Sequence, residues 1–452
     1  MKNVYTPNDF KHLESDAAMI QAAIDEAAKY GVSVIIPRYN ERTDKCIWEI
    51  DKTLWLHDGS DVLLDNCHIR LMDDTYIHFF ANDSASADKK WWRRETRQYD
   101  ISISGRGNAL LDGGNHNNIF EKDFNIYDDN GKFVKKVEVK GFKGIYFNRG
   151  LCFRNVERIK VSGIRFINQR YWGMCFEFCS YGHVKDITFE ALSNVPNQDG
   201  IDIRVGCNNF LIENITGKTG DDTIALTNFP VNEPDVDMDM NIHNVIIKNI
   251  HSELSSKCDI IRLLNRGGTE IYNVQIANVV DISEEYGENR ALAAIRIGDL
   301  NDYPARLNSP GEIRNITVRD VVTRARFGVY VANSLTDSVF ENIMMTSDGG
   351  IGMYFNGCIM KNIFVDKLLY NVKAAAPVTD VGYRHVHHRV NIDYLSAIHF
   401  NNSTGDNINV NNIVGAENLT YIFGGNSNIK IKASNIVAGD RATKLADAPE
   451  II

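Results

Sequence analysis

Three aspartates stand at a spacing that could support acid–base chemistry. Asp199 lies in the segment NQDGIDI, and Asp221 and Asp222 lie in the segment GDDTIAL, which begins 21 residues after Asp199. Glycoside hydrolysis needs one carboxylic acid to protonate the leaving oxygen and a second carboxylate to activate water on the opposite face. Repulsion between close carboxylates raises the pKa of one of them and keeps it protonated as the acid. A single such aspartate could instead cap a turn.

A second set of residues falls at one position of successive predicted strands. Asp202, Ala225, Arg262 and Arg296 occupy this position, so their side chains should point the same way. Two arginines on adjoining strands form a fork suited to a carboxylate or sulfate. The alternative is that Arg262 or Arg296 pairs with Asp202 or Asp259 as a structural bridge, and the sequence leaves both open.

Aromatic and basic residues provide further candidates for substrate binding. Trp91 and Trp92 stand in the run KKWWRR, where exposed tryptophans beside basic groups suit stacking on sugar rings from a loop. A packed loop or a subunit contact explains the same run equally well. Trp172, Lys257 and Asp259 complete the set of expected substrate-binding residues.

No metal site or cofactor is expected from the sequence. Asp235, Asp237 and Asp239 alternate in an acidic insertion, but the glycine and terminal glutamate of a calcium loop are missing, which indicates a solvated loop. The eight cysteines include no CxxC pair and no zinc-like spacing with histidine. We therefore expect reduced, buried cysteines that act as small hydrophobic residues.

Composition limits the class of partner. The formal net charge of −10 argues against a nucleic-acid partner, because phosphate binding needs a basic surface. No run of about 18 apolar residues predicts a membrane span, and the N-terminal MKNVYTPNDF lacks the apolar stretch of a signal peptide. We expect a cytoplasmic protein. The charge is compatible with an oligo- or polysaccharide partner, because an anionic sugar polymer needs only local basic groups, and a homo-oligomer is left open.

A repeat predicts the elements that must position these residues. An apolar residue, a polar residue, then Asn or Asp followed by Ile or Val recurs as IENI, IKNI, IANV and VRDV, with steps of 20 to 42 residues along the series. Alternation of period 2 within each unit indicates strands, and such steps indicate stacked coils with loop insertions. Asn and Asp at the turns could hydrogen-bond between coils. The repeat predicts an all-β, right-handed parallel β-helix.

The N-terminal segment predicts a short helix that caps this β-helix. Apolar residues keep helical spacing over 16–30, between Ser15 as a possible N-cap and Gly31 as a stop. Solenoid ends must be covered, so residues 1–40 are expected to cap the first coil. The whole chain is expected to be one domain, with main coils over about 45–370 and an irregular segment, final coils and a tail over about 371–452.

Several of these segments resemble the polygalacturonase family, glycoside hydrolase family 28 of the pectin-lyase-like β-helix superfamily. They are the opening 16–37, the pair GRG and LDG at 105–113, the aromatic stretch QRYW at 169–172, and the two aspartate segments at 197–203 and 220–226. The aspartate segments are similar to NTDGIDI and GDDCIAI of the family. The resemblance covers roughly residues 15–370 and implies the β-helix and a hydrolase.

The resemblance also implies roles for individual residues. Asp221 would be the acid, while Asp199 and Asp222 would position and deprotonate water, with inversion of the anomeric carbon. Two family residues are replaced, because Asp259 stands where the family has a histidine and Gly298 where it has a lysine after the retained Arg296.

These replacements indicate a divergent member whose substrate is an α-linked, acidic glycan other than plain polygalacturonate. We hypothesise that Arg262 takes over from the lost lysine. A polysaccharide lyase or epimerase on the same fold, or a non-catalytic glycan-binding β-helix, remains the alternative.

Overall fold

The computed structural model describes most of the chain. The described residues are 2–115, 124–127, 132–137, 148–191, 197–254, 258–283, 291–300, 308–346, 350–371, 395–415, 419, 421–427, 429–437 and 450–451. They form two compact units. Unit 1 comprises Met1–Asp202, Lys218–Asp221 and Asp235–Met238, and unit 2 comprises Ile203–Gly217, Asp222–Pro234 and Asp239–Ile452.

Unit 1 is built from short parallel strands that form three columns. The first column is β4, β7, β13 and β17, the second is β1, β2, β5, β9, β15 and β18, and the third is β3, β6, β10, β16 and β18. The strands of these columns are β1 (Val4–Tyr5), β2 (Ser33–Pro37), β3 (Trp48–Ile50), β4 (Leu54–Leu56), β5 (Asp61–Asp65), β6 (His68–Leu71), β7 (Phe80–Asn82), β9 (Ser102–Arg106), β10 (Leu110–Asp112), β13 (Leu151–Arg154), β15 (Lys160–Ser162), β16 (Arg165–Ile167), β17 (Met174–Glu177) and β18 (His183–Glu190).

Smaller elements complete unit 1. Two further pairs are β8 (Gln98–Tyr99) with β14 (Val156–Glu157), which is parallel, and β11 (Phe124–Tyr127) with β12 (Phe133–Val137), which is antiparallel. Three short 3-10 helices are η1 (Pro7–Phe10), η2 (Asp83–Ala85) and η3 (Arg94–Thr96). β19 (Ile201–Arg204) and β20 (Asn208–Thr219) contribute residues to both units.

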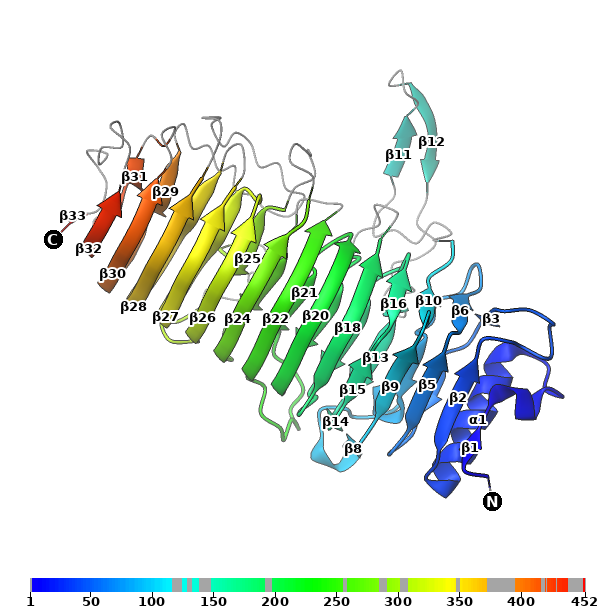
Figure 1. The fold of residues 1–452 in the computed structure, drawn as a ribbon. Helices are drawn as coiled ribbons and strands as arrows, with labels where there is room; N and C mark the ends of the chain where they lie inside the picture. Colours follow the sequence, from blue (N-terminus) through cyan, green and yellow to red (C-terminus); the bar gives the residue numbers. More distant parts are fainter. Residues whose placement is uncertain are drawn as a thin grey trace. The chain divides into compact units, whose positions relative to one another are not determined.

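The capping helix α1 (Asp16–Tyr30) begins and ends where its sequence predicts. The Ser15 hydroxyl accepts a hydrogen bond from Ala18 N at 3.2 Å, and Gly31 takes the left-handed conformation, with φ 63°, that ends the helix. Its buried apolar face packs against β1 to β4, at the N-terminal end of unit 1 in Figure 1. Burial of this face covers the first coil.

Unit 2 repeats the parallel arrangement with longer strands. One column is β21, β23, β25, β27, β28, β29 and β31, and the other is β22, β24, β26, β27, β28, β30, β32 and β33. The bounds are β21 (Ile224–Asn228), β22 (Ile242–Leu254), β23 (Ile261–Asn265), β24 (Ile271–Asp281), β25 (Ala293–Ile297), β26 (Ile313–Thr323), β27 (Phe327–Met345), β28 (Ile351–Tyr370), β29 (Ser396–Asn401), β30 (Thr404–Gly415), β31 (Tyr421–Gly425), β32 (Lys430–Val437) and β33 (Glu450–Ile451).

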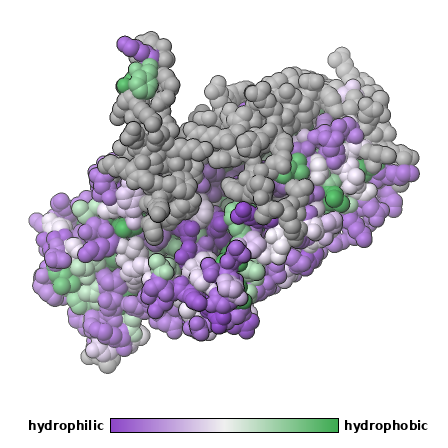
Figure 2. Space-filling view, turned by 180° about the vertical axis from the view of Figure 1, so that it is seen from behind, coloured by the Kyte–Doolittle hydropathy of each residue, from purple (hydrophilic) through white to green (hydrophobic). Residues whose placement is uncertain are grey.

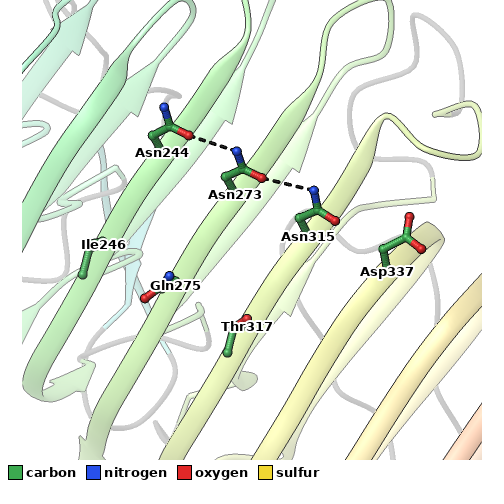
Figure 3. A pocket seen from close by; sticks show the side chains of 7 residues that line it. All are labelled: Asn244, Ile246, Asn273, Gln275, Asn315, Thr317 and Asp337. Carbon is green, nitrogen blue, oxygen red and sulfur yellow. Dashed lines mark hydrogen bonds between the residues drawn. The ribbon is translucent and has the colours of Figure 1, made fainter.

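Asparagine ladders connect the coils of unit 2. Asn273 Nδ2 donates to Asn244 Oδ1 at 3.0 Å, and Asn315 Nδ2 donates to Asn273 Oδ1 at 3.1 Å (Figure 3). A second ladder runs from Asn278 through Asn249 to Asn214 at the repeat positions. All of these asparagines have positive φ, between 53° and 59°, which Asn tolerates better than most residues. The predicted turn hydrogen bonds are confirmed here.

The fold class predicted from the repeat is confirmed. Each unit consists of parallel strands stacked with their apolar side chains inside, as in a right-handed parallel β-helix. Hydrophilic residues predominate on the described surface in the view of Figure 2. Among the described residues, no helix combines the length and apolarity needed to cross a membrane.

Candidate active site

The column of residues predicted from strand alignment is found on β21, β23 and β25. Ala225 pairs in register with Arg262, and Arg262 pairs in register with Arg296. The column continues to Tyr330 on β27, whose ring centre lies 5.4 Å from the Arg296 guanidinium. Residues in register point to the same side of a sheet, so these side chains share one face of unit 2. Asp202 belongs to unit 1, where it is buried.

Arg262 and Arg296 are engaged by three carboxylates of the same unit. Arg262 lies 3.6 Å from Asp222 Oδ2 and donates to Asp299 Oδ2 at 3.0 Å. Arg296 donates to Asp299 Oδ2 at 2.9 Å and to Asp259 Oδ2 at 3.4 Å. The backbone N–H of Asp259 donates to Asp222 Oδ1 at 2.8 Å. These contacts close the five residues into an ionic ring.

The charges of the ionic ring limit what its two arginines can bind. Three carboxylates face two guanidiniums, so the ring has no excess of positive charge to attract a further anion. Of the two alternatives left open by the sequence, this geometry favours the structural bridge.

Asp259 is the most strongly perturbed acid of the ring. The residue is fully buried, and burial raises the pKa of its carboxyl to about 7. The positive charge of Arg296 opposes this rise, while the carboxylate of Asp222 adds to it. Histidine has an ordinary pKa of about 6.5. The residue that stands in place of the family histidine therefore titrates in the pH range of a histidine.

Gly298 explains why the lysine of the resembled family has no counterpart here. Its φ is 76°, and an added Cβ would lie 2.1 Å from the carbonyl oxygen of Ala332. No side chain fits that backbone conformation without a shift. The chain instead places Asp299 directly after this glycine, where it accepts from both arginines of the ionic ring.

Asp199 and Asp221 lie in unit 1 on neighbouring passes of the chain. Asp221 N donates to Gln198 O at 3.3 Å, so its backbone lies against the residue that precedes Asp199. The Thr219 hydroxyl donates to Asp221 O at 2.7 Å, and Gly173 N donates to Asp199 O at 2.8 Å. Asp199 is buried and Asp221 is partly exposed. The separation of one coil inferred from their spacing agrees with this arrangement.

Trp172 packs in an ionic and aromatic cluster of unit 1. Its ring stacks on Tyr171 with centroids 4.8 Å apart, and the Arg149 guanidinium lies 4.8 Å from its centre. Arg149 also lies 3.5 Å from Glu177, which in turn accepts from Arg154. Trp172 is 9% exposed, so it supports neighbouring side chains more than it presents a free ring.

Trp91 and Trp92 lie in a loop that binds the acidic insertion. Trp92 Nε1 and Lys90 Nζ each donate to the Asp235 carboxylate at 2.8 Å. Arg94 N donates to Asp237 Oδ1 at 2.8 Å. The acidic insertion is solvent-accessible as predicted, since Asp237 and Asp239 are exposed and Asp235 is partly exposed. In addition, the carboxylates of Asp235 and Asp237 accept hydrogen bonds from the loop of Trp91 and Trp92.

Trp91 packs against two residues outside this loop. The Arg154 guanidinium lies 4.5 Å from its ring centre, and Phe178 lies 5.7 Å from it. These contacts correspond to the packed loop that the sequence left as an alternative to sugar stacking. Lys257, the remaining candidate, lies outside the described residues.

Sequence reasoning missed Asp299, Arg149 and the pair Arg154 and Glu177. Asp299 follows the end of β25, where strand alternation no longer predicts direction. Arg154 and Glu177 pair in register on β13 and β17, so their separation of one coil could have revealed them.

The family comparison agrees with the motifs. Residues 57–234 match the family model described as Glycosyl hydrolases family 28. This segment contains both aspartate motifs, so the resemblance inferred from them is confirmed, and it supports a glycan-acting enzyme. No curated protein matches the chain.

Solved structures are similar to this chain at low identity. A mutant tailspike protein of E. coli bacteriophage HK620, in complex with a pentasaccharide, is 13% identical over 97% of this chain and 79% of its own, with a TM-score of 0.54. An exopolygalacturonase from Thermotoga maritima is 14% identical over 96% and 88%, with a TM-score of 0.44. A mannuronan C-5 epimerase module from Azotobacter vinelandii is 14% identical over 99% of both chains, with a TM-score of 0.47. The tailspike likeness shows the fold alone.

Proposed function

We propose that this protein is an inverting glycoside hydrolase that cleaves an α-linked, acidic glycan. Asp221 protonates the leaving oxygen, and Asp199 and Asp222 hold and deprotonate the attacking water. The observation that carries the proposal is the placement of Asp221 one coil from the segment of Asp199, within the region that matches the glycosyl hydrolase family.

The contacts of Asp222 hold its carboxylate in one orientation, which suits its proposed role as a base. Its Oδ1 accepts from the Asp259 N–H, and its Oδ2 faces Arg262 at 3.6 Å. Both contacts are ones that a carboxylate makes as an acceptor. Asp222 is 2% exposed, so its rotamer is restricted by packing as well as by these partners. A fixed carboxylate limits the positions that its water can take.

Asp259 acts as a positioning residue in this scheme. It orients Asp222 through its backbone N–H, and its own carboxyl accepts from Arg296 and from Ala293 N. Because burial raises the pKa of this carboxyl to about 7, its protonation changes the charge of the ionic ring near neutral pH. We infer that the replacement of histidine by Asp259 keeps a group that titrates near neutrality beside Asp222.

The test is a panel of neutral and acidic polysaccharides and oligosaccharides, followed by reducing-end assay and proton NMR. The wild-type protein should release reducing ends with inversion, and Asp221→Asn should lower kcat by at least about a hundredfold, because the general acid is lost. Asp65→Asn is the matched control, since Asp65 is a surface carboxylate paired with Arg106.

The outcomes separate the three candidate functions. Unsaturated products would indicate a lyase, and a change of sugar configuration without cleavage would indicate an epimerase. Glycan binding with no turnover would indicate a binding protein. Undiminished hydrolysis by Asp221→Asn would remove the assignment of the acid.

A further inference from the structure

A row of apolar side chains follows the outer surface of unit 2 over successive coils. The strands β24, β26, β27, β28, β30 and β32 pair in register, so residues at matched positions stack along the row. Figure 1 shows these strands one after another in unit 2. We call this row the apolar stripe, and it consists of Val280, Val322, Met344, Leu369, Val414 and Val437.

The side chains of the apolar stripe reach solvent. Val322, Val414 and Val437 are 36%, 42% and 59% exposed, and the other members are partly exposed. Neighbouring residues of a strand point to opposite faces, and Val321, directly before Val322, is fully buried. The stripe therefore lies outside the core that the inward-facing residues form.

The fold alone does not require apolar residues in this row. Each stripe residue lies two positions after a corner residue whose φ is between 54° and 57°. In unit 1, Thr188 holds the same position after the corner residue Asp186, and it pairs in register with Arg165. Strand propensity favours Val and Thr alike, but it does not select Met344 or Leu369. A contiguous exposed apolar row instead indicates an interaction surface.

The corner residues beside the apolar stripe include one charge of each sign. Asp320 lies two residues before Val322, and Lys367 lies two residues before Leu369, so the two charges flank the coil of β27, one coil away on each side. Both side chains are exposed, and neither forms an ion pair with a described residue. Asn342, the corner residue between them, is uncharged and donates to the Asp320 carboxylate at 2.7 Å. Opposite charges at equal distances from one coil complement each other under a twofold rotation about that coil.

We propose that the apolar stripe is a homodimer interface, on which unit 2 of a second copy of this chain packs in the antiparallel direction. The twofold axis passes through the coil of Met344. It places Val322 against Leu369 of the second copy, and Asp320 beside Lys367 of the second copy. Both stripes have the same spacing of about 4.8 Å per coil, so the side chains from β24 to β30 interdigitate. A different partner would need this repeat to fill the same surface.

The size of the apolar stripe predicts a weak and reversible dimer. Strands about 4.8 Å apart give the stripe a length of about 24 Å. A standard interface buries about 800 Å² on each partner, which exceeds what one row of side chains and its corner residues can cover. The net charge of −10 also opposes the approach of two copies. We therefore expect a dissociation constant on the order of 10 to 100 µM.

Sedimentation velocity of the full-length protein tests this interface between about 5 and 500 µM, a range that spans the expected constant. Wild type should change from monomer to dimer across the range. Val322→Glu sets a carboxylate against apolar side chains of the second copy and should weaken association at least about tenfold. Ile246→Glu is the matched control, because Ile246 is 41% exposed and belongs to a different outward row, that of Gln275. It should leave the dissociation constant unchanged.

Charge reversal tests the antiparallel arrangement. Lys367→Asp sets two negative charges beside each other across the interface and should weaken the dimer several-fold. Addition of Asp320→Lys restores opposite charges and should return the dissociation constant toward that of wild type. Both corners have φ 57° in the native chain, one with aspartate and one with lysine, so the backbone accepts either residue. Circular dichroism and thermal unfolding check the fold of each variant.

The result that would overturn the interface is a wild-type protein that stays monomeric at the highest concentration. Equal weakening by Ile246→Glu and Val322→Glu would also overturn it, because the stripe would then have no special role. If the double exchange failed to recover the association lost in Lys367→Asp, the antiparallel pairing would be wrong.

Discussion

This protein has two groups of arginines that contact carboxylates, and the groups differ in the distances of these contacts. In the ionic ring of unit 2, Arg262 and Arg296 meet three aspartates at 2.9 to 3.6 Å. In unit 1, Arg149 lies 3.5 Å from Glu177, which Arg154 also contacts. The ionic ring holds neighbouring coils together and orients Asp222. The contacts of Arg149 with Glu177 and Cys152 are longer, so they should contribute less to stability. The distance between opposite charges therefore indicates how much each arginine contributes to the structure.

The largest expected effect comes from breaking the ionic ring at Arg296. Arg296→Met removes a guanidinium that is 1% exposed and leaves Asp259 without its arginine. Removal of one partner from a buried pair costs about 3 to 5 kcal/mol. Urea unfolding at pH 8, where Asp259 is ionised in the wild-type protein, should show this loss in the free energy of unfolding.

The same measurement on Arg149→Met sharpens the comparison. Its hydrogen bonds are long, and Glu177 keeps Arg154 as a partner, so the loss should stay below about 1.5 kcal/mol. Equal losses for the two variants would show that both arginines are structural and would contradict the distinction drawn here.

Much of the fold could be predicted from the sequence, because the β-helix repeat consists of short local patterns of residue types. Asn249 and Asn278 recur in the repeat, and the structure shows them in a ladder. The column of Arg262 and Arg296 followed from strand alignment alone. Successive side chains of a strand point to opposite faces of the sheet. The position of a residue along its strand therefore predicts the face to which its side chain points.

The partners of these side chains could not be predicted in the same way. Asp299 follows a strand end and reaches both arginines of the ionic ring from a turn. The pKa of Asp259 depends on complete burial, which no local pattern reports. Loop contacts such as Trp92 with Asp235 join segments 143 residues apart. Charge balance within a cluster is a property of the assembled coils, so it requires the structure.

A third prediction concerns the pH dependence that Asp259 confers on the ionic ring. Its pKa is raised from the ordinary value of 3.8 to about 7 in the folded protein. Between these values the folded state binds more protons than the unfolded state, so this contribution to stability is lost as pH rises from about 4 to about 7. Relative to Asp259→Asn, wild type should therefore become less stable across that window.

The difference between the two proteins is the quantity to measure, by urea unfolding at pH 4.5, 6 and 7.5. Burial lowers the pKa of His78 to about 3 and that of His399 to about 4, and both act in the opposite direction within this window. They are present in both proteins and cancel in the difference. A difference that does not change with pH would show that Asp259 stays ionised throughout.

The smallest expected effect concerns the contact between loop residues 90–97 and Asp235 in unit 1. This contact tests whether exposed charges contribute as much to the free energy of unfolding as buried charges do. Asp235→Ala removes the acceptor of Lys90 and Trp92. Because these side chains are partly exposed, the free energy of unfolding should change by less than about 1 kcal/mol. Hydrogen–deuterium exchange of the loop residues 90–97 should nevertheless increase, and added salt should reproduce part of that increase in wild type.

Asp239→Ala is the matched control, since Asp239 belongs to unit 2 and lies 3.6 Å from His243 instead. Unchanged loop exchange in Asp235→Ala would mean that packing of Trp91 against Arg154 holds the loop without help from the charges.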